Sequence, residues 1–263
     1  MPTEGGNIDQ RSQQILQELL RAGRVGVDEL ARLFDVSPST IRRQLRALES
    51  KGLLRRTHGG AITIAPMLYE PFRHLSSFQE QEEQHASEKR RIGLAAAALI
   101  ADGETISIGA GTTTTQVARS LMHRKGITVI TNSLNVAMEL SNRSDLRVFV
   151  SGGYLSGDWF ALVGPTALTS VTEIFVDKAF IGVDGIHPEL GLTTNYPDQA
   201  TIHRAMIRQA RQRIVVADHG KVGVVGRALI ALANEINIFV TDSGASEESI
   251  ALLTAKGIDV RRT

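Results

Sequence analysis

The sequence predicts an α/β protein of two parts, a short N-terminal part and a larger part built on a mostly parallel sheet. Three observations support this prediction. Apolar residues recur at helical spacing up to residue 50, and two short β-prone runs around a Gly-Gly pair follow. Beyond Gly103, strand-like and helix-like runs alternate, which is typical of parallel sheets. Residues 36–66 hold six Lys or Arg against one acid, whereas the whole chain carries a net charge of +1.

Length and composition exclude several classes of protein. The 263 residues suit one large or two smaller domains, and 42% hydrophobic residues suit a globular core. The chain has no cysteine, which excludes disulfides and thiolate metal sites, and its seven histidines show no metal-binding spacing. No apolar run approaches the ~20 residues that cross a bilayer, and the first ten residues lack a signal-peptide pattern. We therefore expect a cytoplasmic protein with no metal site and no contact with a membrane.

The first two helices are predicted to form the start of a helix-turn-helix. The apolar stripe within residues 15–20 predicts a helix that ends near Gly23. A second, short helix covers residues 28–34, and it is expected to bury three side chains: Leu30, Leu33 and Phe34. Residues 35–37 then turn tightly into a third helix. In a helix-turn-helix, the helix after the turn enters the DNA major groove by its N-terminal part.

The third helix has one apolar face and one basic face. Ser37 can cap it and Pro38 suits its first position, while Gly52 is expected to end it. The apolar face carries Ile41, Leu45 and Leu48. The opposite face carries Ser39, Arg42, Arg43 and Arg46. Such a face could be a solvated helix surface, but the preceding turn and the charge of this region favour contact with DNA.

Residues 53–62 predict a hairpin, the wing of a winged helix-turn-helix. Double-stranded DNA is therefore the expected partner of residues 10–64. The residues expected to contact it are Ser37, Ser39, Thr40, Arg42, Arg43, Arg46, Arg55, Arg56 and His58. Base reading is assigned only to Ser39, Thr40 and Arg43, because contacts to phosphate are the more numerous class.

A linker and a second domain are predicted to follow. Residues 65–78 contain Pro66 and Pro71 among scattered polar residues and are taken as the linker, so the second domain is residues 79–263. Residues 79–100 are predicted to form one helix that stops at Asp102. The six strands predicted after it are residues 105–108, 128–130, 147–150, 178–183, 213–217 and 236–241. The five helices predicted among them are residues 114–123, 134–142, 165–172, 198–211 and 246–256.

Polar turns follow five of these strands and predict a site for a small anionic ligand. Ligands of parallel sheets bind beyond the carboxyl ends of the strands, where glycines allow close approach and helix N-termini hold phosphate. The residues of these turns taken as ligand-binding are Gly109, Gly111, Thr112, Thr113, Asn132, Ser133, Gly152, Gly153, Asp184, Gly185, Asp218 and Lys221. One such turn alone would be an ordinary connection. A dinucleotide fingerprint would need a third glycine where Thr114 stands, so no cofactor is expected.

The chain resembles the DeoR family of transcription regulators along nearly its whole length. The first part is similar through residues 27–43 and 58–61. The second part is similar at Lys89-x-x-Ile92 and at residues 111–114, 130–134, 152–153, 163–165, 177–182 and 204–207. The resemblance implies a homo-oligomeric repressor, a dimer or a tetramer, that binds operator DNA of a sugar-utilisation operon. It implies that residues 79–263 sense a phosphorylated sugar or a sugar-derived effector, with a fold akin to sugar-phosphate isomerases and CoA transferases.

Three stretches depart from the pattern of that family. Many members carry Asp where this chain has Gly109, and a Glu and a Lys where it has Gln199 and His203. Asp-x-Ser-Lys is common where this chain has Asp218-His-Gly-Lys221, so Asp218 and Lys221 are retained. The resemblance adds Gln199 and His203 to the expected effector site. If the usual Lys contacts a phosphate, His203 does so only weakly or only when protonated. The effector then differs from the commonest ones, or carries its anionic group elsewhere.

Two other functions compete with a repressor. The first is a sugar-phosphate isomerase with an appended DNA-binding domain, which would need a carboxylate base such as Asp184 or Asp218. The second is activation of transcription, which depends on operator position and not on the protein sequence. The segment of residues 153–163 contains the only Trp and could form a lid over the ligand or pack in the core or a subunit contact.

Overall fold

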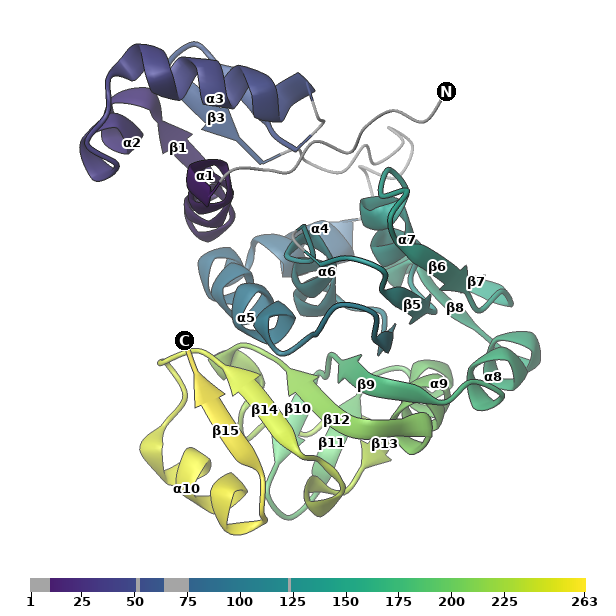
Figure 1. The fold of residues 1–263 in the computed structure, drawn as a ribbon. Helices are drawn as coiled ribbons and strands as arrows, with labels where there is room; N and C mark the ends of the chain where they lie inside the picture. Colours follow the sequence, from purple (N-terminus) through teal and green to yellow (C-terminus); the bar gives the residue numbers. More distant parts are fainter. Residues whose placement is uncertain (1–9, 51–52, 64–75, 123) are drawn as a thin grey trace. The chain divides into compact units, whose positions relative to one another are not determined.

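The computed structural model describes residues 10–50, 53–63, 76–122 and 124–263 (Figure 1). The chain divides into two compact units, Met1–Leu68 and Tyr69–Thr263, which are described separately. Gly52, the expected end of the third helix, Ile64 and residues 65–75 of the expected linker lie outside the described residues.

The first unit is a winged helix-turn-helix, as the sequence predicts. Its helices are α1 (Gln10–Ala22), α2 (Val27–Leu33) and α3 (Pro38–Ser50). Its antiparallel sheet has the order β1 (Arg24–Gly26), β3 (Gly60–Ile62) and β2 (Arg55–Thr57), so the hairpin gains a third strand from the segment between α1 and α2. Apolar side chains from all three helices form the core, among them Ile15, Leu16, Leu19, Leu30, Ile41, Leu45 and Leu48.

The turn before α3 has the expected cap, but the burial predicted for α2 is partly wrong. Ser37 Oγ accepts a hydrogen bond from the backbone N–H of Thr40 at 3.3 Å. Leu33 is 58% exposed and Phe34 is only partly buried. The helix begins at Val27, one residue earlier than predicted, and its buried stripe consists of Val27, Leu30 and Ala31. Leu33 lies beside that stripe and faces solvent.

The second unit is built on a seven-stranded sheet in which every neighbouring pair of strands is parallel. The strands, in spatial order, are β15 (Asp259–Arg262), β14 (Ile238–Thr241), β12 (Ala210–Val216), β9 (Val176–Ile181), β4 (Thr105–Ile108), β5 (Thr128–Thr131) and β6 (Arg147–Val150). The six predicted strands are confirmed, and β15 extends the sheet beyond them.

Helices cover both faces of this sheet (Figure 1). One face is covered by α5 (Ala86–Ala98), α6 (Thr112–Arg119) and α7 (Leu134–Leu140). The other face is covered by α8 (Pro165–Thr172), α9 (Pro197–Gln209) and α10 (Glu247–Ala255). No helix of the described residues is long and apolar enough to cross a membrane.

The described residues of this unit also form two smaller sheets and three short 3-10 helices. The hairpin of β7 (Tyr154–Ser156) and β8 (Ala161–Val163) holds η2 (Gly157–Trp159). A second antiparallel sheet has the order β10 (Gly185–His187), β11 (Gly191–Thr194) and β13 (Ala228–Ala231). The other two 3-10 helices are η3 (His219–Lys221) and η4 (Ala233–Glu235). None of the five strands was predicted.

The single helix predicted for residues 79–100 is wrong. The structure has two helices there, α4 (Ser76–Glu83) and α5, with a turn between them. His85 in this turn has a φ of 52°, in the left-handed region that a bulky residue rarely adopts. The backbone carbonyls of Gln81 and Gln84 accept hydrogen bonds from the buried ammonium group of Lys89 instead of from a continuing helix.

Candidate functional site

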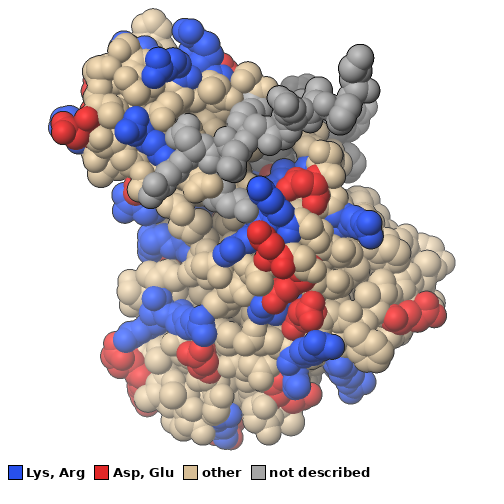
Figure 2. All heavy atoms as spheres, in the orientation of Figure 1, with Lys and Arg blue, Asp and Glu red and all other residues tan. Residues whose placement is uncertain are grey.

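Helix α3 presents its predicted basic face to solvent. Ile41, Leu45 and Leu48 are buried, whereas Arg42, Arg43 and Arg46 are exposed. Arg42 and Arg43 make no ion pair with another residue in the part of the chain that the structure describes. In Figure 2, Lys and Arg side chains lie at the surface of this unit among a few acidic ones, and basic and acidic side chains are mixed over the face shown of the second unit. The two free guanidinium groups can therefore bind an acidic partner.

The remaining residues predicted to contact DNA differ in how free they are. Arg55 and His58 are exposed on the wing. Arg56 is engaged, because its Nε lies 2.6 Å from Oε2 of Glu49 and its backbone N–H donates to Oε1 of the same carboxylate. These hydrogen bonds lower the pKa of Glu49. The pair fastens β2 to α3 and fixes where the wing lies relative to the basic face.

Three hydroxyl groups cluster at the start of α3. Ser37 Oγ lies 2.8 Å from Ser39 Oγ and 2.9 Å from Thr40 Oγ1. Ser37 and Ser39 are exposed, and Thr40 is partly buried. The Ser37 oxygen is thus engaged in capping α3. Ser39 is the exposed hydroxyl of the three that takes no part in the cap.

The second unit contains a pocket of about 470 Å³, part of it open to solvent. Its wall includes the segments that directly follow β4 and β9, so it lies beyond the carboxyl ends of central strands, as predicted. Seven of the predicted site residues line it: Gly111, Thr112, Thr113, Asp184, Gln199, His203 and Lys221. Seven other residues line the pocket: Gln81, Ala110, Trp159, Gly182, Val183, Thr194 and Tyr196. Of these, only Trp159 belongs to a segment that the sequence suggested as a lid, and the other six were missed.

The N-terminus of α6 forms one corner of this pocket. The hydroxyl groups of Thr114 and Thr115 donate to the carbonyl oxygen of Gly111, at 2.9 and 2.8 Å, and hold the turn that precedes the helix. In the first turn of a helix the backbone N–H groups have no partner within the helix, and here they belong to Thr112 and Thr113. Lys221 lines the same pocket and adds a positive charge. This combination favours a phosphate or a carboxylate.

Helix α9 lines the pocket with a neutral histidine. His203 is only 1% exposed, and neither of its ring nitrogens has a hydrogen-bond partner among the described residues. Burial lowers the pKa of His203 to about 4, although the nearby carboxylate of Asp184 acts in the opposite direction. A Cβ atom on Gly109 would lie 2.9 Å from Nε2 of His203. Gly109 is not among the residues that line the pocket. Its lack of a side chain leaves the space that the ring of His203 occupies.

A carboxylate and two aromatic rings complete the wall. Asp184 Oδ2 accepts hydrogen bonds from Thr194 Oγ1 and from the backbone N–H of Asn195, each at 2.8 Å. The rings of Trp159 and Tyr196 lie 5.4 Å apart, and both line the pocket. The segment of residues 153–163 serves two purposes, because Trp159 lines the pocket while β8, which follows it, is buried in the core.

Five other predicted site residues do not line the pocket but shape the loops around it. Asn132 is buried, accepts a hydrogen bond from the backbone of Ala110 and donates one to the carbonyl of Leu162. Ser133 caps α7. Gly152 and Gly153 precede β7, and a Cβ on Gly153 would lie 2.4 Å from the carbonyl oxygen of Val163. Gly185 begins β10, where a Cβ would lie 2.2 Å from the carbonyl oxygen of Val224.

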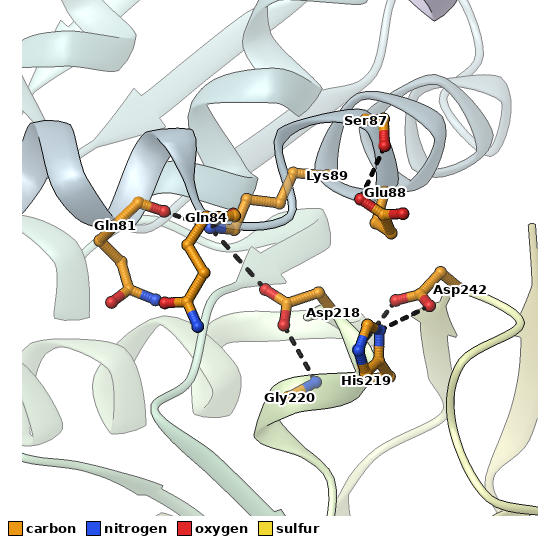
Figure 3. Close-up of polar contacts among 9 residues, drawn as sticks. All are labelled: Gln81, Gln84, Ser87, Glu88, Lys89, Asp218, His219, Gly220 and Asp242. Carbon is orange, nitrogen blue, oxygen red and sulfur yellow. Dashed lines mark hydrogen bonds and ion pairs between the residues drawn. The ribbon is translucent and has the colours of Figure 1, made fainter.

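Asp218 also lies off the pocket lining, in contact with a buried lysine (Figure 3). Lys89 is 1% exposed, and its Nζ donates to the carbonyl of Gln84 at 2.6 Å, donates to the carbonyl of Gln81, and lies 3.8 Å from Asp218 Oδ2. Burial lowers the pKa of Lys89, and the Asp218 carboxylate opposes that change. Lys89 thereby joins α4, which lines the pocket through Gln81, to the turn that carries Lys221.

Sequence reasoning did not single out Lys89 for this role. A signal for it was present, because Lys89 shares its helix face with Ile92 and Ala96, both of which are buried. A lone lysine on a buried helical face needs partners inside the protein. Close to it, His219 Nδ1 lies 2.8 Å from Asp242 Oδ1, but no group of three or more potential ligands among the described residues could hold a metal ion.

Comparison with known proteins gives matches along both units. Residues 11–66 match the model of the DeoR-like helix-turn-helix domain, and residues 84–243 match that of the DeoR C terminal sensor domain. The chain is 34% identical to the HTH-type transcriptional repressor GlcR of Bacillus subtilis, over 96% of this chain and 95% of that protein. It is 33% identical to the HTH-type transcriptional regulator GlpR of Haloferax volcanii, over 95% and 96% of the two chains. Among solved structures, ribose 5-phosphate isomerase A of Methanocaldococcus jannaschii is similar over 55% of each chain, with 20% identity and a TM-score of 0.38.

Proposed function

Because this chain belongs to the DeoR family of helix-turn-helix transcriptional regulators, we propose that it represses a carbohydrate-utilisation operon and leaves its operator when a small phosphorylated sugar binds. The observation that carries the proposal is the pairing of two features in one chain. One unit exposes unpaired guanidinium groups on a helix-turn-helix, and the other holds a pocket with an anion-binding corner.

DNA binding is assigned to the exposed face of α3 and to the wing. Arg42 and Arg43 lie in the first half of α3, the part of such a helix that reaches base edges and adjacent phosphates. Arg55 and His58 extend the contact to the wing. We assign Arg56 mainly to holding the wing through Glu49, because a guanidinium group already paired with a carboxylate has less to offer a phosphate.

Effector binding is assigned to the pocket of the second unit. The pocket brings polar groups of α6, α9 and the turn at Lys221 together with two aromatic rings, the mixture that is typical of small-molecule sites. The backbone N–H groups of Thr112 and Thr113, together with Lys221, would hold the anionic group of the effector. Asp184 and the aromatic rings of Trp159 and Tyr196 would contact its carbon skeleton and hydroxyl groups.

Coupling between ligand and DNA is assigned to α4. This helix is the first described element of the second unit, and it contributes Gln81 to the pocket wall. A ligand that prefers one position of α4 shifts the protein toward that position. In a homo-oligomer, the spacing of two winged helices must match the spacing of two operator half-sites, so a change in that spacing lowers affinity.

Fluorescence anisotropy with the labelled DNA upstream of its own gene tests the proposal. Replacing Arg42 and Arg43 by Ala is expected to weaken binding about 100-fold and to make it less dependent on salt, because two charges that meet DNA are lost. The matched control is Arg21→Ala, which removes an exposed cation of the same unit that is paired with Glu18. Equal affinity of the double variant and the control would contradict the proposal.

A catalytic role is not proposed. The relatives are named as regulators, and an isomerase would need a carboxylate free to accept a proton from the substrate. Asp184 accepts two hydrogen bonds within the protein, and Asp218 is buried beside Lys89 and does not line the pocket. Turnover of a pentose or hexose phosphate would overturn this assignment.

A further inference from the structure

Two polar side chains on α9 line the pocket with atoms that have no hydrogen-bond partner among the described residues. Gln199 and His203 stand four residues apart, so they lie on one face of the helix, and both line the pocket. They are 6% and 1% exposed. Gln199 Nε2 and both ring nitrogens of His203 have no hydrogen-bond partner among the described residues. Leaving a buried polar atom unpaired costs about 1–3 kcal/mol, so three such atoms beside one pocket indicate a ligand that pairs with them.

The unpaired groups fit hydroxyls. A neutral imidazole offers one donor and one acceptor, and the amide nitrogen of Gln199 offers donors. Trp159, which lines the same pocket, has a buried indole N–H that is also unpaired among the described residues. A hydroxyl group both donates and accepts, so a row of sugar hydroxyls satisfies all of these atoms.

The charges beside α9 disfavour a second anion. Lys221 is the only cationic side chain among the pocket-lining residues of the described chain, and it is assigned to the corner at the start of α6. The Asp184 carboxylate lies close enough to His203 to affect its pKa, and His203 remains uncharged at neutral pH because it is buried. An anion placed against α9 would lose its water and meet a negative charge with no cation to balance it.

Resting on the function proposed above, we infer that the effector carries a single anionic group, held at the start of α6 and by Lys221, and turns uncharged hydroxyl groups toward Gln199 and His203. The pocket then selects a sugar or polyol monophosphate over a bisphosphate or a phosphorylated sugar acid of the same skeleton. Helix α9 produces this selectivity because Gln199 and His203 are uncharged and offer hydrogen bonds to hydroxyl groups.

Isothermal titration of the full-length protein with matched pairs of ligands tests the inference. The pairs are fructose 6-phosphate with fructose 1,6-bisphosphate, glucose 6-phosphate with 6-phosphogluconate, and glycerol 3-phosphate with 3-phosphoglycerate. In any pair that binds, the member with one anionic group is expected to bind at least about tenfold tighter than the member with two. A tighter second member in any pair overturns the inference and leaves the proposed function standing. If no member of any pair binds at about 10 mM, the proposed effector class fails, and the inference fails with it.

Variants of α9 then separate recognition from structure. His203→Gln keeps an uncharged hydrogen-bonding group and is expected to keep the preference for one anion. His203→Lys places a cation there and is expected to shift the affinity ratio of a pair by about tenfold toward the member with two anionic groups. Since a buried lysine can prevent folding, Gln199→Leu is the second variant, and it should weaken the preferred ligand about tenfold.

The matched control is Thr201→Ala, because Thr201 is exposed on α9 and does not line the pocket. A purely structural role of α9 would change the affinity for both members of a pair alike. An affinity ratio that does not move in His203→Lys, in a variant that still binds operator DNA, overturns the inference.

Discussion

His203 is a side chain whose charge is set by burial. Its folded-state pKa of about 4 lies below the ordinary value of 6.5, so the unfolded chain takes up a proton first as the pH falls. The contribution of neutral His203 to the free energy of unfolding is therefore fully present above about pH 6.5, decreases as the pH falls toward 4, and is absent below that value.

We expect the free energy of unfolding to fall by about 2 kcal/mol between pH 7 and pH 5 because of His203 alone. His203→Gln removes the titrating group and is expected to remove that part of the dependence. Urea unfolding of both proteins at the two pH values measures it. Equal losses in the two proteins would show that other groups cause the pH dependence.

Lys221 is expected to hold the anion of the effector. Lys221→Ala should weaken binding of the preferred sugar phosphate about tenfold, because a charge-assisted hydrogen bond contributes about 1.5 kcal/mol or more. Lys256→Ala is the control, since it removes a cation that pairs with Glu189 and does not line the pocket. Calorimetric titration of both variants compares them, and similar affinities would place the anion elsewhere in the pocket.

At the scale of elements, the two adjacent glycines of the wing, Gly59 and Gly60, differ in the space that a side chain would have. A Cβ on Gly60 would lie 1.9 Å from the carbonyl oxygen of Val25, whereas a Cβ on Gly59 would meet nothing within 4 Å. The close approach of β3 to β1 therefore depends on Gly60 alone.

Gly60→Ala is expected to destabilise the first unit by about 2 kcal/mol or more and to weaken DNA binding, while Gly59→Ala should change the stability by less than about 0.5 kcal/mol. Thermal unfolding and anisotropy measure the two effects. A Gly60→Ala protein as stable as Gly59→Ala would mean that β1 does not pair with the wing in solution.

The α4–α5 junction depends on Lys89. Lys89→Met keeps most of the side-chain volume but leaves two carbonyls and the Asp218 carboxylate without their cation, so we expect a loss of about 3–5 kcal/mol. The control is Lys125→Met, since Lys125 is exposed. Denaturant unfolding compares the two, and a Lys89→Met protein of unchanged stability would exclude a structural role for the buried ammonium group.

The sequence predicted the main sheet because its strands are short apolar runs that end at polar turns. It failed at His85, since Gln84-His85-Ala86 contains no glycine or proline and fits a helix. The interruption between α4 and α5 depends on Lys89, which is buried only through tertiary packing that the local sequence does not reveal. The small strands such as β10 and β11 were missed because each begins with a glycine and lacks a clear alternation of apolar and polar residues.

The pocket was partly predictable for a similar reason. Gly111, Thr112 and Thr113 form a local turn between a strand and a helix, which the sequence reveals directly. Trp159 and Tyr196 reach the pocket from loops far apart in the chain, and only folding brings their rings to 5.4 Å. Asn132 and Ser133 have the composition of ligand-binding residues, but their polar groups satisfy the backbone.

At the scale of the whole molecule, a repressor that its effector releases must link operator binding and effector binding through one equilibrium. If the effector lowers the affinity for DNA by a given factor, DNA must lower the affinity for the effector by the same factor. We expect a coupling of about tenfold to 100-fold, which corresponds to about 1–3 kcal/mol. Titrating the preferred sugar phosphate into the protein with and without saturating operator duplex measures it. Identical effector affinities in the two titrations would contradict a repressor released by that ligand.

The buried ammonium group of Lys89 favours a two-state change at the turn between α4 and α5 over a gradual one. A charge that has exchanged water for two carbonyls and a carboxylate cannot be shifted a little, because each lost partner leaves it unsolvated. If a metabolite displaces α4, we therefore expect each molecule to keep all the contacts of Lys89 or to lose them together. A higher metabolite concentration then changes only the fraction of molecules in which α4 is displaced. Two dyes on introduced cysteines, which are unique in a chain without native ones, would then report two populations and no gradual drift.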